Sequence, residues 1–259
     1  MPYLERKGIT FYQFNSLVEH KIIHAIFTRH GGVSPKPWSS LNVGATVGDE
    51  LSRVQENRNR VFSAVNVSPN SIYEVWQVHS AAVVIADHPK HPRAVHKKAD
   101  VILTNKRRVN LFMRFADCVP IFLYDPVKNV VGLAHAGWRG TVNKAAYAAL
   151  SAMQATYGST PANVIACIGP SICQEHYPVG EEVVSAMKDT FGSQANELIQ
   201  RTGNEARLDL CRANKLVLEQ TGVNQIEAAK ICTVCDVQDW YSHRAENGST
   251  GRFGAMIGL

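Results

Sequence analysis

Residues 121–134 read Ile-Phe-Leu-Tyr-Asp-Pro-Val-Lys-Asn-Val-Val-Gly-Leu-Ala, and this stretch decides the fold class. Two apolar runs, Ile121–Tyr124 and Val130–Ala134, flank a polar segment that contains proline and asparagine. Apolar β-forming residues on both sides of a short turn of this composition predict an antiparallel hairpin. An antiparallel pair in the middle of the chain argues against a purely parallel, doubly wound sheet.

Other strand-like runs come before the hairpin. Runs rich in Val, Ile or Phe, bounded by polar or proline-containing stretches, predict strands at residues 22–28, 72–78, 83–86, 101–103 and 111–115. Between the first two of these runs, Asp49 is placed to cap a helix that continues through Val54, Arg58 and Val61.

Helices dominate the second half of the chain. Apolar residues at helical spacing predict helices over 142–153, 183–191 and 209–221. Gly158 is the expected stop of the first helix and Asp209 the expected N-cap of the last. A strand is predicted at 164–168, and the tail returns to strand and loop from Ile231. These patterns predict a single mixed α/β domain over residues 1–259, with mixed sheets, hairpins and flanking helices.

Composition and charge narrow the classes of partner. A hydrophobic fraction of 45% and a charged fraction of 19% predict an ordinary folded globular chain. The net charge is +5, but Lys and Arg are dispersed, and their densest cluster is only Lys106–Arg108. That distribution favours small anionic substrates over a nucleic-acid groove, which needs a clustered basic stripe.

The expected compartment is the cytoplasm. No apolar run approaches the ~18 residues that span a bilayer, and the mixed charges of the N-terminus do not resemble a secretory signal, so no membrane association is expected. The six cysteines are Cys118, Cys167, Cys173, Cys211, Cys232 and Cys235. In a cytosolic chain of this size, thiols or metal ligands are favoured over disulfides.

The segment from Val130 to Thr141 is the first candidate for chemistry. It predicts a strand that delivers His135 at its C-terminal end, a glycine-flanked turn, and the start of a helix. The unpaired N–H groups of a helix start attract anions, and Arg139 in the turn could hold a phosphate bidentately. The structural alternative is a tight turn that needs its glycines, with His135 hydrogen-bonded in the core.

Two further candidates lie where strands end. Cys118 stands between two apolar strands and two residues before Pro120, which removes a ladder donor and lets the chain bend. His79 lies where one predicted strand ends and another begins. The structural alternatives are an inert buried thiol and a hydrogen-bonded histidine.

Together, His79, Cys118 and His135 predict a catalytic metal site. Two histidines and one cysteine with an open fourth position are typical of a catalytic rather than a structural zinc. Such a zinc ion makes water a nucleophile at neutral pH. Copper is the less favoured alternative metal. Spacing alone leaves open whether the three side chains converge.

Several longer motifs carry a family resemblance. Gln77-Val78-His79, Ala116-Asp117-Cys118-Val119-Pro120 and His135-Ala136-Gly137-Trp138-Arg139-Gly140-Thr141 resemble the signature of the YfiH-like, or laccase-domain, family of purine nucleoside phosphorylases, also called the multicopper polyphenol oxidase domain family. Thr28–Ser34, Ser40–Gly44, Asn57-Arg58, Cys232-Thr233, Ser242-His243-Arg244 and Thr250-Gly251-Arg252 match it as well. The resemblance extends from about residue 20 to the end.

The resemblance implies a fold, a metal and an activity. The fold would be a mixed α/β domain with zinc on His79, Cys118 and His135. Similar proteins phosphorolyse adenosine, inosine, guanosine or methylthioadenosine and deaminate adenosine, so the expected partners are nucleosides and phosphate. Candidates for contact with these substrates are Arg29, Asn42, Arg58, Arg139 and Arg244.

This sequence departs from the family pattern at two places. Ser80 stands where glycine is expected, and His243-Arg244-Ala245 stands where Tyr-Arg followed by a charged residue is common. These departures put the preferred ribose or base in doubt rather than metal binding. Separately, Cys232-Thr233-Val234-Cys235 has zinc-ribbon spacing but no second cysteine pair, which favours free thiols over a structural metal.

Three rival functions use the same residues. A copper polyphenol oxidase would need His-x-His pairs, which the ten histidines never form, although copper in the open site could oxidise phenols weakly. A metal-free cysteine hydrolase would use Cys118 as nucleophile and His135 as base. A non-catalytic module would bind nucleosides without turnover. The general acid or base, the preferred nucleoside and the oligomeric state stay open.

Overall fold

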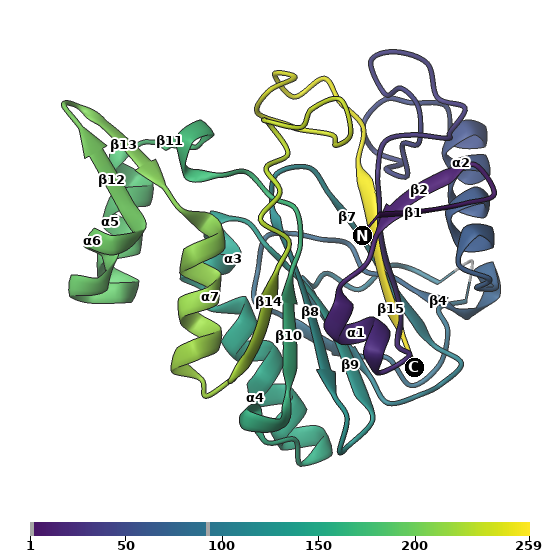
Figure 1. Ribbon diagram of the computed structural model, residues 1–259, viewed down its shortest axis with the longest axis horizontal. Coiled ribbons are helices and arrows are strands. Elements are labelled where there is room, and N and C mark those ends of the chain that lie inside the picture. The colour runs from purple at the N-terminus through teal and green to yellow at the C-terminus, as the bar shows by residue number, and fades with distance from the viewer. Residues whose placement is uncertain (1–2, 92–93) are drawn as a thin grey trace.

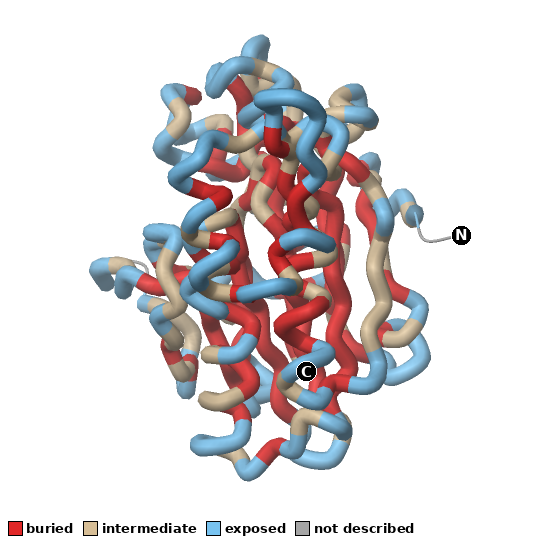
Figure 2. The backbone as a smooth tube through the Cα atoms, turned by 90° about the vertical axis from the view of Figure 1, so that its left-hand side faces the viewer, coloured by how far each residue is buried: buried red, intermediate tan, exposed pale blue. Residues whose placement is uncertain are grey.

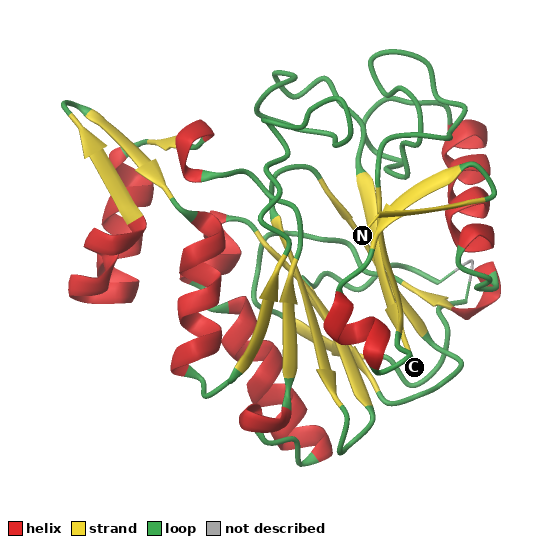
Figure 3. Cartoon of the chain, viewed as in Figure 1, coloured by secondary structure: helices red, strands yellow, loops and turns green. Residues whose placement is uncertain are grey.

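The structure is a computed structural model that describes residues 3–91 and 94–259. Its described strands form two six-stranded sheets and one three-stranded sheet (Figures 1 and 3). The first sheet has the order β1 (Tyr3–Arg6), β2 (Ile9–Tyr12), β3 (Ile23–Phe27), β15 (Phe253–Gly258), β7 (Asn110–Phe115), β4 (Ile72–Tyr73). The second has the order β14 (Gln225–Ala228), β10 (Ile165–Ile168), β8 (Val119–Asp125), β9 (Val130–Ala136), β6 (Val101–Thr104), β5 (Val83–Ile85). The third has the order β11 (Pro178–Val179), β13 (Glu205–Leu208), β12 (Ile199–Thr202).

The pairing is mixed, as the sequence predicted. β4 with β7, β5 with β6, and β10 with β14 pair in parallel, and the other described pairs are antiparallel. The predicted hairpin is β8–β9, with Ile121 opposite Ala134. In its turn, Asp125 Oδ1 accepts hydrogen bonds from the N–H groups of Val127 and Lys128. The predicted fold class is therefore confirmed, while the assignment of all 259 residues to one enzyme domain stays a prediction.

The two large sheets pack face to face and are covered by helices. The described helices are α1 (Asn15–Glu19), α2 (Leu51–Ala64), α3 (Trp138–Val142), α4 (Ala145–Tyr157), α5 (Glu181–Phe191), α6 (Ala195–Leu198) and α7 (Leu210–Gln220). α2 lies beside the first sheet, and α4 and α7 cover the outer face of the second (Figure 1). The layers therefore run helix, sheet, sheet, helix.

Alternating side chains explain these layers. On β9, Val130 and Ala134 face the helices, whereas Val131 and Leu133 face the first sheet. Both faces of such a central strand are buried, so its sequence is nearly all apolar rather than alternating with polar residues. Buried residues lie mainly in the strands, and exposed residues lie mainly in the loops and on the outer faces of the helices (Figure 2).

Three local predictions need correction. The helix predicted from Val142 is interrupted, because Lys144 adopts a left-handed conformation (φ 56°) between α3 and α4. The N-cap of α2 is Glu50 rather than Asp49, whose Oδ2 accepts hydrogen bonds from Ser34 and Asn42 instead.

The third correction concerns the strand predicted at 72–78. It is limited to Ile72–Tyr73, because the following backbone is hydrogen-bonded to loops: Trp76 N–H donates to the Lys97 carbonyl, and Val78 N–H donates to Asp100.

Two predicted helix caps are confirmed. Gly158 is the C-cap of α4, and Asp209 is the N-cap of α7. Within the described residues, no helix combines the length and apolar character that crossing a bilayer requires.

A candidate metal centre

His79, Cys118 and His135 converge in space. One ligand atom from each lies within 4.8 Å of the ligand atoms of the other two. His79 comes from the loop between β4 and β5, Cys118 from the link between β7 and β8, and His135 from β9. The predicted meeting of two imidazoles and a thiol is thus present in the structure.

Unusual backbone conformations aim two of these side chains. His79 has φ 60° and Asp117, which precedes Cys118, has φ 80°, a left-handed region that residues other than glycine seldom adopt. Asp117 is held there because its carboxylate accepts hydrogen bonds from Thr233 Oγ1 (2.6 Å) and from the Arg244 N–H (2.7 Å). Strain of this kind is common at functional sites.

Asp100 organises both histidines. Its Oδ1 accepts a hydrogen bond from His135 Nδ1 at 2.9 Å, so Nε2 is the nitrogen of that ring that could bind a metal. Its Oδ2 accepts from the N–H groups of Val78 and Ser80, the residues on either side of His79. Burial alone would raise the pKa of Asp100, but hydrogen bonds from His135 and Ser80 lower it to about 2. The carboxylate is therefore ionised at neutral pH.

Cys118 and His135 each shift the pKa of the other toward its charged form. Burial alone would raise the pKa of Cys118, but the charge of His135 and hydrogen bonds from both histidines lower it to about 6. Burial alone would lower the pKa of His135, but Cys118 and Asp100 raise it to about 9. A thiolate is the form of cysteine that binds metals and acts as a nucleophile.

Gly137 leaves the room that this cluster needs. A Cβ atom built at Gly137 would lie 2.8 Å from Cys118 Sγ and 3.3 Å from His79 Cδ2. Two imidazoles and one thiolate with space beside them match the donor set of a catalytic zinc. The residues present therefore fit a single zinc ion.

A cavity of about 580 Å³ opens onto the cluster. Of the five predicted substrate contacts, Arg58, Arg139 and Arg244 line it. The Arg139 side chain is 58% exposed and lies over Trp138, with 4.2 Å from Cζ to the ring centroid. Arg139 lies on α3, which has only five residues. An anion bound here would therefore be stabilised by side chains more than by a helix dipole.

Arg29 and Asn42 do not line this cavity. Arg29 lines a separate hollow, where its guanidinium donates to the carbonyls of Ser39 and Val237 and pairs with Glu246. Asn42 is fully buried, and its Oδ1 accepts from the N–H groups of Gly44 and Arg252, two residues that do line the cavity. Both residues support loops at some remove from the candidate metal centre.

Sequence reasoning missed several residues around the cavity. Glu74 pairs with Arg58 and with Arg114 Nη1 at 2.8 Å, and His96 Nε2 lies 3.1 Å from its Oε1. Burial alone would raise the pKa of Glu74, but His96 and the two arginines hold it well below its usual range. The lysines that follow His96 in the sequence give no sign of its contact with a buried carboxylate.

Arg252 was also missed as a lining residue, although it lies in a recognised motif. Its Nη1 donates to the carbonyls of Thr250 and Gly251. Within residues 3–91 and 94–259, neither Arg252 nor Arg244 has a carboxylate at ion-pair distance from its guanidinium. These two cations are therefore available to an anion in the cavity.

Comparisons with known proteins place the chain in a family. Residues 23–259 match the family model described as "Multi-copper polyphenol oxidoreductase laccase". The chain is 37% identical to purine nucleoside phosphorylase YlmD of Bacillus subtilis, covering 92% of this chain and 89% of that protein. It is 32% identical to adenosine deaminase RL5 of an unknown prokaryotic organism, covering 89% and 91% respectively.

A solved structure has the same fold as this chain. The crystal structure of the hypothetical protein YfiH of Bacillus licheniformis matches with a TM-score of 0.92 and 29% identity, covering 100% of this chain and 99% of that chain. The chain belongs to the multi-copper polyphenol oxidoreductase laccase family, and the resemblance seen in the sequence is confirmed.

Proposed function

We propose that this member of the multi-copper polyphenol oxidoreductase laccase family is a zinc-dependent purine nucleoside phosphorylase that also deaminates adenosine. The carrying observation is the convergence of His79, Cys118 and His135 at the cavity. Relatives named for both activities support the proposal. The proposed substrates are adenosine, inosine, guanosine and methylthioadenosine, and the proposed compartment is the cytoplasm.

The three ligands would hold the zinc ion. When bound, zinc supplies a Lewis acid and makes water nucleophilic at neutral pH. Asp100 fixes the ring of His135 so that Nε2 faces the other ligands. Because a carboxylate–imidazole hydrogen bond also raises the basicity of the ligand, Asp100 strengthens the site as well as orienting it.

The cavity walls suit a purine and an anion. Its volume lies within the range of ordinary small-molecule sites. Trp76 is 49% exposed although it lines the cavity, and Tyr177 lines it as well, so aromatic faces are available to stack on a base. Arg139, Arg244 and Arg252 supply guanidinium groups, which match the geometry of phosphate.

Two reactions follow from this arrangement. In phosphorolysis, a phosphate oxygen bonds to ribose C1′ while the bond from C1′ to the base breaks, and the base leaves with the electron pair and gains a proton. In deamination, water adds at C6 of adenine and ammonia leaves. Guanidinium groups would serve the first reaction by positioning phosphate near the ribose, and water positioned at the base would serve the second.

One alternative has a specific observation in its favour. A metal-free cysteine hydrolase would use a carboxylate that holds an imidazole, which in turn contacts a thiolate. Asp100, His135 and Cys118 are arranged in this way. His79 argues for the metal, because a hydrolase of that type needs no second imidazole at the thiolate. By contrast, the groups of metal-binding side chains found among the described residues include no trinuclear copper site.

The test is metal analysis combined with an adenosine assay, with and without phosphate. For the wild-type chain we expect bound zinc, release of adenine only when phosphate is present, and formation of inosine in both conditions. The Cys118→Ala variant should lose zinc from this site and at least 100-fold in both activities, as loss of a ligand implies.

Cys211→Ala provides the matched control, because Cys211 lies on α7 outside the cluster. It should keep zinc and activity. Full activity in metal-free protein would contradict the proposal and favour the cysteine hydrolase. Binding of inosine without turnover would favour the non-catalytic module.

A further inference from the structure

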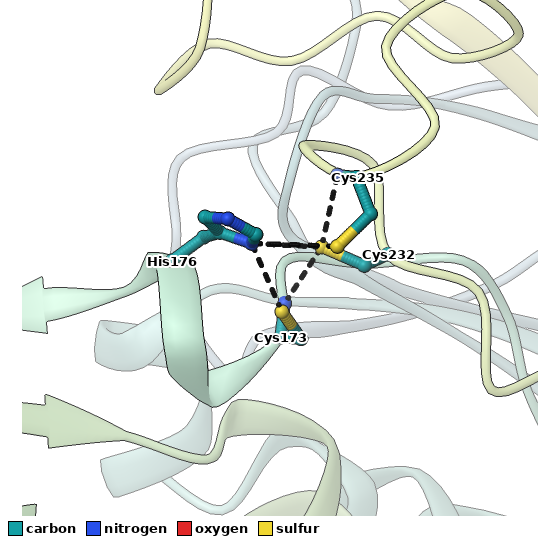
Figure 4. Close-up of side chains that lie close together, drawn as sticks. All are labelled: Cys173, His176, Cys232 and Cys235. Carbon is teal, nitrogen blue, oxygen red and sulfur yellow. Dashed lines mark hydrogen bonds between the residues drawn. The ribbon is translucent and has the colours of Figure 1, made fainter.

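A second group of metal-binding side chains lies outside the candidate metal centre. Cys173, His176, Cys232 and Cys235 each offer one ligand atom, and these atoms lie within 4.8 Å of one another. Figure 4 shows the imidazole of His176 pointing toward the three sulfur atoms. Cys232 and Cys235 were interpreted from the sequence as free thiols, because no second cysteine pair was found. Their partners are instead a cysteine and a histidine, Cys173-x-x-His176.

The distances match a tetrahedron around one ion. His176 Nδ1 lies 3.3 Å from Cys173 Sγ, 3.8 Å from Cys232 Sγ and 3.5 Å from Cys235 Sγ. A tetrahedral zinc ion with Zn–S bonds of about 2.3 Å and a Zn–N bond of about 2.0 Å would place nitrogen and sulfur about 3.5 Å apart. The ring nitrogen therefore already stands at ligand-to-ligand distance from all three sulfurs.

Two backbone N–H groups donate hydrogen bonds to one of the three sulfur atoms. Cys232 Sγ accepts hydrogen bonds from the N–H groups of Cys173 (3.3 Å) and Cys235 (3.5 Å). Hydrogen bonds to ligand atoms from groups around them orient those atoms and tune a metal site. Three soft thiolates and one imidazole favour zinc over hard cations such as magnesium or calcium.

We propose that Cys173, His176, Cys232 and Cys235 bind a second zinc ion, which fastens the loop after β10 to the loop before β15. Four protein ligands leave no open coordination position, so this ion is structural rather than catalytic. The proposal does not depend on the proposed function.

The two fastened loops form part of the cavity wall. Beside the cluster, Thr233 Oγ1 donates to the Asp117 carboxylate, and the Ile172 N–H donates to the Asp117 carbonyl. Further along, Arg244 Nη1 donates to the Pro178 carbonyl. The second zinc ion would thus stabilise the residues that hold Asp117 in its left-handed conformation, next to Cys118.

The test is the zinc content of the wild-type chain and three variants, measured by mass spectrometry. We expect Cys118→Ala to retain one equivalent of zinc, at the second site. Cys235→Ser should contain one equivalent less than Cys211→Ser, the matched control outside both clusters. Cys235 is exposed, so its substitution leaves the core intact. Zinc-free Cys118→Ala, or equal zinc in Cys235→Ser and Cys211→Ser, would overturn the proposal.

Two further measurements do not depend on zinc copurifying with the chain or on a folded variant of the second site. Cobalt(II) added to metal-free Cys118→Ala should give the intense visible absorption of a tetrahedral thiolate site, and an octahedral spectrum would count against it. The unfolded, metal-free wild-type chain should titrate as six free thiols, whereas fewer would reveal a disulfide in the cluster.

Hydrogen exchange tests the structural role. In Cys235→Ser, amide exchange over residues 230–245 should rise at least 10-fold, while exchange in β8 and β9 stays as in the wild type. Unchanged exchange over residues 230–245 after loss of the zinc ion would contradict the fastening role.

Discussion

At the scale of single residues, Asp100 has the widest influence on the candidate metal centre. One of its carboxylate oxygens orients His135, and the other holds the backbone on both sides of His79. Two candidate ligands, one in a loop and one on β9, thus depend on one buried side chain. A carboxylate matters at this position because its ionised form is acceptor-only, so both oxygens can accept hydrogen bonds at once.

Replacing Asp100 tests this dependence. Asp100→Asn puts an NH₂ group where one oxygen accepted a hydrogen bond, so one histidine loses its orientation. We expect zinc affinity at the His79–Cys118–His135 site to fall 10- to 100-fold, the range typical of partners that orient ligands. Competition with a chromophoric chelator measures this affinity. The control is Asp189→Asn, an exposed residue of α5, and equal affinities in the two variants would refute the role of Asp100.

Gly137 makes a second prediction at this scale. A methyl group there overlaps Cys118 Sγ, which can rotate away at little cost to folding but then no longer faces the histidines. Gly137→Ala should therefore lower zinc affinity at least 10-fold while the melting temperature changes by only a few degrees. Gly180→Ala is the control, since apart from its chain neighbours no atom of the described residues lies within 4 Å of its added Cβ. Full zinc affinity in Gly137→Ala would mean that the site tolerates the methyl group.

The sequence could predict the three candidate ligands but not the residues that support them. His79, Cys118 and His135 are chemically distinctive and fall at strand ends within long motifs. Asp100 follows two lysines and an alanine at the start of an apolar strand, where an acidic residue usually marks a solvated loop end. Only its burial in the fold reveals a different role.

At the scale of elements, hydrophobic patterns located most helices and strands but not their breaks. The period of apolar residues continues across Lys144, so nothing in the pattern marks the turn between α3 and α4. Likewise, residues 74–78 have the composition of a strand, yet the backbone N–H groups of Trp76 and Val78 donate to loops. Local propensity is a weak guide wherever tertiary contacts satisfy the backbone differently.

Strand β3 carries a buried histidine whose titration affects folding. His24 is fully buried, its Nε2 accepts a hydrogen bond from the Phe14 N–H, and its Nδ1 lies 3.0 Å from the Ile22 carbonyl. This arrangement requires the neutral ring. Burial lowers the pKa of His24, and the hydrogen bond to the Ile22 carbonyl and the negative charge of Glu227 offset this only partly.

The sign of the pH dependence follows from linkage. The unfolded chain, with an ordinary histidine pKa near 6.5, binds a proton more readily than the folded chain does. The contribution of His24 is therefore present above pH 6.5 and is lost as pH falls through the lower pKa of the folded state. Urea unfolding at several pH values between 7.5 and 5 should show a shallower loss of stability in His24→Gln than in the wild type. His20→Gln, at an exposed position, should keep the wild-type slope, and an unchanged slope in His24→Gln would contradict a neutral, buried His24.

At the scale of the whole molecule, both candidate metal sites depend on the pairing of strands that are far apart in the sequence. β15, at the end of the described chain, lies between β3 and β7 in the first sheet. The segment before it, residues 229–252, supplies Cys232, Cys235 and the backbone that holds Asp117. Periodicity predicts that a strand exists, but it does not say which distant strand lies beside it.

The same limit explains the missed second cluster. Cys173 and Cys232 are 59 positions apart, and the histidine that completes their set has no neighbouring cysteine pair to mark it. Family resemblance supplied the convergence of the first three ligands, whereas the second group emerged only from the folded chain. Sequence reasoning thus found the candidate metal centre but not the second cluster beside it.

The most direct measurement is anomalous X-ray diffraction from crystals of catalytically active protein, collected on both sides of the zinc absorption edge. We predict a zinc peak within bonding distance of His79, Cys118 and His135, with its fourth position facing the cavity. Active crystals that show no zinc peak among those three side chains would contradict a zinc-dependent reaction at this site.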